Sequence, residues 1–87
     1  MISQDIRDAI QRFARLPDAE IQRAVLRCEA AQTALDVIRS GRPVVEAHRI
    51  VAALFKVSPS SVANWERRFG HAPAGYELFF LTDRRGS

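Results

Sequence analysis

The chain contains 87 residues, 47% of them hydrophobic, and its 13 basic and 10 acidic residues give a formal net charge of +3. This length and composition are typical of one small globular domain and exclude an intrinsically disordered chain. The isoelectric point of about 10.0 fits an acidic partner such as nucleic acid.

Cys28 is the only cysteine, which excludes a disulfide framework and a cysteine-based metal site. Because it lies among Ala, Val and Leu, we interpret it as a small buried hydrophobic residue and not as a nucleophile.

No apolar run approaches the roughly 20 residues that span a bilayer. The start "MISQDIRD" lacks the character of a signal peptide. We therefore expect a cytoplasmic protein with no membrane partner.

Residues 1–41 predict a platform of two helices. Apolar residues recur at helical spacing from Ile2 to Phe13, so the first helix is expected over residues 3–15. Pro17 interrupts it, and acidic residues follow at once, as at the start of a second helix. That helix should end before Gly41, which can adopt the left-handed cap conformation. An Ala-rich middle suggests close packing against a neighbour, and the apolar residues expected along this helix are Ile21, Val25, Cys28, Leu35 and Ile38.

Residues 43–69 predict a helix-turn-helix, in which two short helices are joined by a turn of about three to four residues. A proline suits the first turn of a helix over residues 44–55. Residues 56–58 form the turn, and a Ser-Pro pair can cap and open the next helix. That helix is expected to end near Phe69, before Gly70.

Residues 70–87 are expected to form a short helical turn followed by a basic tail. Tyr76, Phe79 and Phe80 can pack this turn back on the core. No run alternates between apolar and polar residues convincingly enough to predict a strand. The predicted fold class is therefore all-α, a small bundle of about five helices that contains a helix-turn-helix.

The helix-turn-helix needs a small residue where its two helices cross, and Ala52 provides one. Val57 is expected to fill the gap between the helices, while Val62 and Trp65, three apart, give the second helix its buried stripe. Trp65 could instead stack on a base, but its spacing favours the core. Many such turns have Gly with positive φ where this chain has Lys56, and a non-Gly residue there costs on the order of 1 kcal/mol.

The outward face of the second helix is predicted to carry Ser60, Ser61, Asn64, Arg67 and Arg68. In DNA-binding examples, the N-terminal part of this helix meets base edges in the major groove. Asn can bond adenine through N6 and N7, and Arg can bond guanine through O6 and N7. Ser60 and Ser61, with the free amides of the first turn, suit a phosphate or a base. We expect Asn64 to be the principal sequence-reading residue. A solvated amphipathic helix is the alternative interpretation of the same pattern.

The sequence gives no basis for catalysis, a cofactor or a metal. His48 and His71 are too far apart to pair by local spacing, and neither has an obvious acid or thiol partner. Glu46, Glu66 and Glu77 form no plausible carboxylate pair, and a Gly-rich phosphate loop is lacking. We therefore expect a non-catalytic domain that needs no cofactor.

The stretch "VAALFKVSPSSVANWERRF" and the later "GYELFFLTDRRGS" resemble the DNA-binding region of phage Mu-like transposases. The resemblance covers about half of the chain, residues 44–86, with Lys56 where that family tends to have Gly and Tyr76 where it tends to have Trp. It implies the first of the domains that recognise the ends of the transposon or phage genome, followed by a recombinase core. The ending "DRRGS" suggests a fragment of such a longer protein.

The expected function is sequence-specific binding of double-stranded DNA by a domain that is monomeric in isolation, with the remaining transposase domains as further partners. Arg84 and Arg85 are expected to reach the DNA backbone or an adjacent minor groove. The predicted DNA-binding residues are Ser58, Ser60, Ser61, Asn64, Arg67, Arg68, Arg84 and Arg85. One alternative is a transcriptional regulator with the same motif, which usually dimerises to span two half-sites. Another is a helical protein-interaction module whose exposed polar residues are only solvated.

Overall fold

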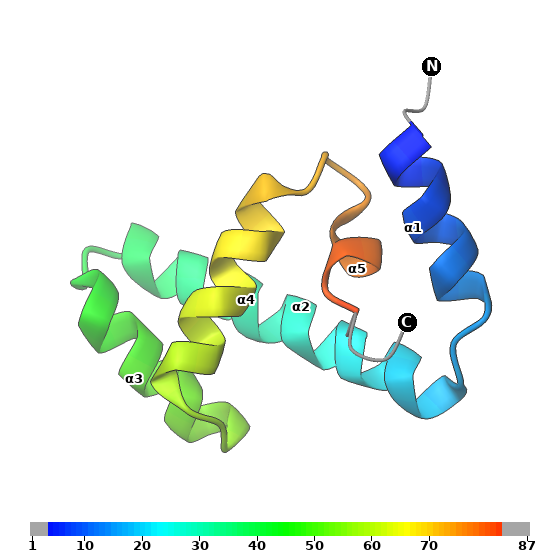
Figure 1. Ribbon diagram of the computed structural model, residues 1–87. Helices are drawn as coiled ribbons and strands as arrows, with labels where there is room; N and C mark the ends of the chain where they lie inside the picture. Colours follow the sequence, from blue (N-terminus) through cyan, green and yellow to red (C-terminus); the bar gives the residue numbers. More distant parts are fainter. Residues whose placement is uncertain (1–3, 83–87) are drawn as a thin grey trace.

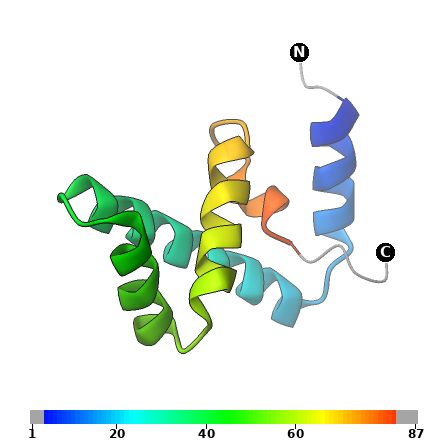
Figure 2. The same cartoon turned by 60° about the vertical axis from the view of Figure 1, so that its left-hand side comes forward.

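The computed structural model describes residues 4–82 as five helices without a strand, which confirms the all-α prediction. The helices are α1 (Gln4–Ala14), α2 (Asp18–Arg39), α3 (Val44–Phe55), α4 (Pro59–His71) and α5 (Glu77–Phe80). The long helix α2 runs along the molecule, with α3 and α4 packed on it toward one end and α5 between α4 and α1 (Figures 1 and 2). No helix in this part of the chain is long and apolar enough to cross a membrane.

The boundaries of α2 follow from its terminal residues. Pro17 precedes it in an extended conformation, and Asp18 and Glu20 lie in its first turn, where carboxylates interact favourably with the helix dipole. At the other end, Gly41 adopts a φ of 108° and donates its N–H to the carbonyl of Ile38. This left-handed conformation is cheap only for glycine, which confirms the predicted stop.

Helix α4 is longer than expected, because it continues through Gly70 and ends at His71. The expected stop near Phe69 is therefore wrong. Gly70 does not take positive φ, and open space surrounds the position where a Cβ would lie. The chain leaves the helix at Ala72, directly before Pro73, and a residue before proline is disfavoured in the helical conformation.

The fully buried positions of α2 are all alanines, while Ile21, Cys28, Leu35 and Ile38 are partly buried. Ala24, Ala30, Ala31 and Ala34 are fully buried, whereas the side chain of Val25 is 40% exposed. Alanine lets helix backbones approach closely, so both α3 and α4 can lie directly on α2. The expected close packing of the Ala-rich middle is thus confirmed.

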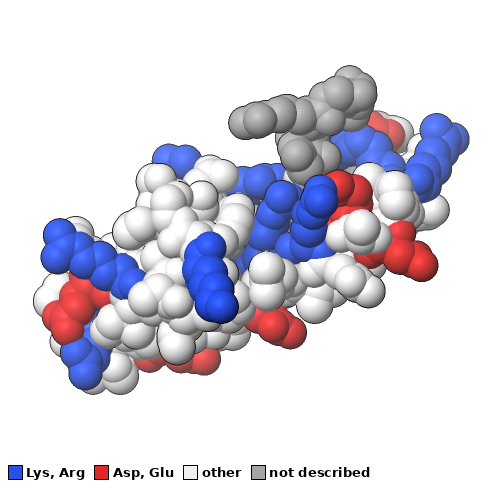
Figure 3. Space-filling view, turned by 90° about the horizontal axis from the view of Figure 1, so that it is seen from below, with Lys and Arg blue, Asp and Glu red and all other residues white. Residues whose placement is uncertain are grey.

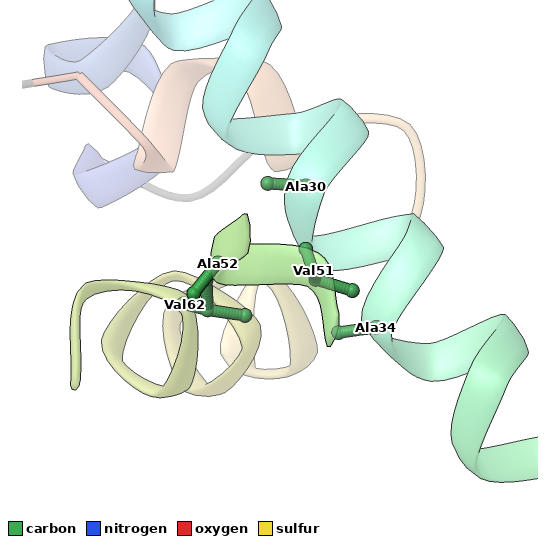
Figure 4. Packing of buried hydrophobic residues seen from close by; sticks show 5 residues of the cluster. All are labelled: Ala30, Ala34, Val51, Ala52 and Val62. Atoms are coloured by element: carbon green, nitrogen blue, oxygen red, sulfur yellow. The ribbon is translucent and has the colours of Figure 1, made fainter. Parts of the chain in front are cut away.

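The main buried cluster lies where α2, α3 and α4 meet. Val51 and Ala52 from α3 and Val62 from α4 pack against two of the alanines of α2 (Figure 4). Ala52 is 3% exposed, so the small residue predicted at the crossing lies in the core. Phe55, Val57 and Trp65 surround this cluster and are partly buried.

A second region of packing joins α5 to α1. The rings of Phe13 and Phe79 meet edge to face with their centroids 4.9 Å apart, and Tyr76 lies beside Phe79 at 6.0 Å. Leu81, directly after α5, is fully buried, and Thr82 is 5% exposed. The predicted short helical turn therefore packs back on the domain.

Candidate nucleic-acid interface

The turn between α3 and α4 has the geometry that a helix-turn-helix requires. Lys56 is left-handed, with φ 57° and ψ 46°, and is the only non-glycine residue with positive φ among residues 4–82. The N–H groups of Lys56 and Val57 both donate to the carbonyl of Ala52, which closes the end of α3. Val57 then turns toward the core and packs against the buried cluster, as expected.

The N-terminus of α4 is organised by Ser58. Its backbone is extended, and its hydroxyl accepts a hydrogen bond from the N–H of Ser61 at 3.2 Å, as in an N-cap. The same hydroxyl lies 2.9 Å from Oγ of Ser61 and 3.2 Å from Oγ of Ser60. Pro59 occupies the first turn, where its missing N–H costs no helical hydrogen bond.

The buried side of α4 consists of Val62, Trp65 and Phe69. Val62 is fully buried, and Trp65 packs against the cluster while part of its ring stays exposed. The guanidinium carbon of Arg27 lies 5.9 Å from the centroid of the Trp65 ring, within cation–π range. These contacts support the interpretation of Trp65 as a core residue.

On the opposite side of α4, Asn64 and Arg67 form a connected pair. Counting about 100° per residue, they lie roughly 160° and 140° around the axis from Val62, so both face away from α2 and α3. Nη2 of Arg67 donates a hydrogen bond to Oδ1 of Asn64 at 3.1 Å. Ser60, one turn earlier, and Arg67 are exposed, and Asn64 is partly exposed.

Arg68 does not share this outward face. It is half-buried, and its Nη2 donates to the carbonyl of Thr82 at 2.7 Å. From α2, Nη1 of Arg27 donates to the neighbouring carbonyl of Leu81 at 2.9 Å. Arg27 and Arg68 thus form an arginine clamp, which ties the segment after α5 to α2 and α4. The expectation that Arg68 lies on the outward face is wrong, because its side chain turns toward this segment.

Sequence reasoning missed a hydrogen-bonded pair inside the helix-turn-helix. Nε2 of His48 on α3 bonds the carboxylate of Glu66 on α4, and the two side chains are only 13% and 20% exposed. The expectation that His48 has no acid partner is therefore wrong. The residues are 18 apart in the chain, so no local spacing could reveal the pair.

The remaining chemistry of the described residues is sparse. Burial raises the pKa of the Cys28 thiol from 9.0 to about 11, with smaller contributions from Glu77 and Glu29, so its reactive thiolate is disfavoured. Residues 4–82 contain no group of His, Cys, Asp or Glu side chains that could hold a metal ion. Arg84 and Arg85, predicted to contact DNA, lie outside this described range.

Charged side chains are spread over the surface. Figure 3 shows Lys and Arg side chains at several places on one face, interrupted by acidic and uncharged residues.

Comparison of the chain with protein-family models, with curated proteins and with solved structures finds no match. We therefore infer the function from the residues of the helix-turn-helix themselves.

Proposed function

We propose that the domain binds double-stranded DNA in a sequence-specific manner through the outward face of α4. The observation that carries this proposal is the left-handed turn at Lys56, which leads α4 across α2 and α3 with Asn64 and Arg67 facing outward. Positive φ is uncommon at a non-glycine residue and persists where the surrounding packing favours it. Here it sets the turn after α3, and Asn64 and Arg67 on the following helix point away from α2 and α3, as a groove-binding helix requires.

The groups on this face suit the parts of a DNA duplex. Ser58, Ser60 and Ser61 lie at the N-terminus of α4, where their hydroxyls can contact phosphate. Asn64 and Arg67 lie further along, where side chains reach base edges. Arg68 belongs to the clamp, so its contribution to binding is indirect, through the position of the C-terminal segment.

Within this proposal, the resemblance to phage Mu-like transposases supports a narrower role. The domain would recognise the ends of a transposon or phage genome in the bacterial cytoplasm, as a monomeric part of a longer transposase. The other transposase domains would be its further partners. A transcriptional regulator with the same motif is the second candidate, and dimerisation on DNA with two half-sites would favour it.

The test is binding to labelled duplexes at several salt concentrations. A phosphate-binding face releases counterions, so the affinity should fall steeply as salt rises, whereas binding to a protein partner need not follow this relationship. The informative variant is Arg67→Met, and the control is Arg7→Met, which removes the same charge from an exposed position on α1. Wild-type protein that binds no duplex at low salt would disprove the proposal and favour a protein-interaction module.

A further inference from the structure

We propose that Asn64 and Arg67 act as one unit that reads guanine, in which Arg67 contacts the base and Asn64 positions its guanidinium. This inference rests on the proposed DNA binding and names the base that the face selects. It differs from the expectation drawn from the sequence, in which Asn64 itself pairs with adenine. The hydrogen bond between the two side chains is the observation that separates the two readings.

The Asn64–Arg67 pair presents mainly hydrogen-bond donors to a ligand. An Asn amide has one oxygen acceptor and two N–H donors, while a guanidinium has only donors. One of the two lone pairs of Oδ1 of Asn64 accepts the hydrogen bond from Arg67 at 3.1 Å. The groups directed outward from the pair are therefore mainly N–H donors, and they carry a positive charge.

The two purines match this arrangement differently. In the major groove, guanine presents two acceptors, N7 and O6, whereas adenine presents the acceptor N7 and the donor N6. Donors on the pair match both positions of guanine. On adenine, the guanidinium held at Oδ1 would face the N6 amino group, so donor would meet donor. Adenine bound in the usual way would have to share Oδ1 of Asn64 with Arg67.

The hydrogen bond to Asn64 also restricts the conformations of the Arg67 side chain. A free arginine loses considerable side-chain entropy when it is fixed on a base. Asn64 lies three residues earlier, which is the spacing at which side chains meet on a helix surface. Because Arg67 is exposed and has this neighbour, its guanidinium is partly ordered before DNA arrives, and binding needs less additional ordering.

The experiment starts with selection of duplexes from a random library by the wild-type domain. We expect one guanine to be enriched at a fixed position. Replacing that guanine by adenine or by 7-deazaguanine, which lacks N7, should weaken binding about tenfold. Replacement by inosine, which keeps N7 and O6, should leave the affinity nearly unchanged.

Three variants then separate the roles of the two side chains. Arg67→Met should remove the preference for guanine over adenine. Asn64→Leu should reduce the same preference, because the guanidinium loses its partner. Asn64→Asp supplies another acceptor for Arg67, so it should keep the preference while its negative charge lowers affinity for all duplexes alike. Circular dichroism checks that each variant is folded.

The outcomes distinguish this inference from the proposed function. Selection of adenine, together with loss of that selection in Asn64→Asp, would overturn the guanine reading and restore direct pairing of Asn64 with adenine. A base preference that survives in Arg67→Met would also overturn it. If the wild-type domain binds no duplex, the proposed function and this inference fail together, whereas binding without guanine selection removes only the inference.

Discussion

Glu66 on α4 receives a hydrogen bond from His48 on α3, and this pair joins the two helices of the helix-turn-helix on the side away from Asn64. Both side chains are largely buried, with 13% and 20% of their surface exposed. Together with Val62, the pair restricts rotation of α4 about its own axis. The orientation of the outward face of α4 therefore depends on a polar contact as well as on apolar packing.

The first prediction tests this pair. Glu66→Ala should lower the free energy of unfolding by about 1–3 kcal/mol, because it leaves His48 without its partner in a mostly buried position. Glu66→Gln retains an acceptor and should lose less. The control is Glu46→Ala, which breaks the exposed pair with Arg42 and should change the stability by less than about 1 kcal/mol. Urea unfolding measures all three, and equal losses for Glu66→Ala and Glu46→Ala would contradict the prediction.

The second prediction concerns the turn. Lys56→Gly should raise the free energy of unfolding by up to about 1 kcal/mol, because glycine adopts the left-handed conformation of this residue without strain. Lys56→Val should destabilise the domain, since β-branched residues are strongly disfavoured at positive φ. Thermal unfolding of the two variants provides the measurement. A loss of stability in Lys56→Gly would show that the lysine side chain makes a contact worth more than the backbone strain.

The third prediction concerns Trp65. Trp65→Ala should cost about 3 kcal/mol, at the lower end of the range for large aromatic truncations because the ring is only partly buried. Trp65→Phe keeps most of the contact with the cluster and should cost less. Both variants can be compared by urea unfolding. Unchanged stability in Trp65→Ala would instead favour a role for the ring in stacking on a base.

The fourth prediction separates the two neighbouring arginines of α4. Because Arg67 is placed on a base edge and not on a phosphate, Arg67→Met should remove the preference for guanine and reduce the slope of log affinity against log salt by less than about one. Arg68→Met should leave this slope nearly unchanged and lower the stability by about 1–3 kcal/mol, because the carbonyl of Thr82 loses its donor. An altered salt slope for Arg68→Met without a change in stability would return Arg68 to the DNA interface.

The fifth prediction concerns Cys28. Because burial raises the pKa of its thiol to about 11, the folded domain should react with iodoacetamide at pH 8 at least about tenfold more slowly than the urea-unfolded chain. The folded state holds its proton more tightly than the unfolded state. The contribution of this group to stability should therefore be constant below pH 9 and fall as the pH rises toward 11. Equal reaction rates in the two states would show that the thiol is accessible and ionises normally.

Local patterns predicted the parts of this fold that depend on neighbouring residues. The bounds of α3, the cap at Gly41 and the positive φ of Lys56 all follow from proline, glycine and turn signals within a few residues. The Ala-rich middle of α2 predicted close packing, although hydrophobicity alone ranks Val25 above the alanines for burial. Close approach of two further helices gives the buried positions to Ala30 and Ala34 instead.

The contacts of the candidate site were harder to predict because they join distant segments. His48 and Glu66 meet only after α3 and α4 have folded against each other. Arg68 lies three residues after Trp65, at the border between the inward and outward faces of α4. Its guanidinium donates a hydrogen bond to the carbonyl of Thr82, which lies 14 residues later in the chain. No helical periodicity contains that information.

The alanine face of α2 has a consequence for how the domain tolerates mutation. Most cores are damaged by truncation, but Ala24, Ala30, Ala31 and Ala34 have almost no side-chain volume to lose. Harm should come from enlargement, because all four alanines are fully buried and added methyl groups would overpack their surroundings. Saturation mutagenesis of α2 should therefore give the reverse of the pattern usual for a core. At these four sites, glycine and serine should be tolerated better than valine or leucine. Sequence drift along this helix would be limited by side-chain size more than by hydrophobicity.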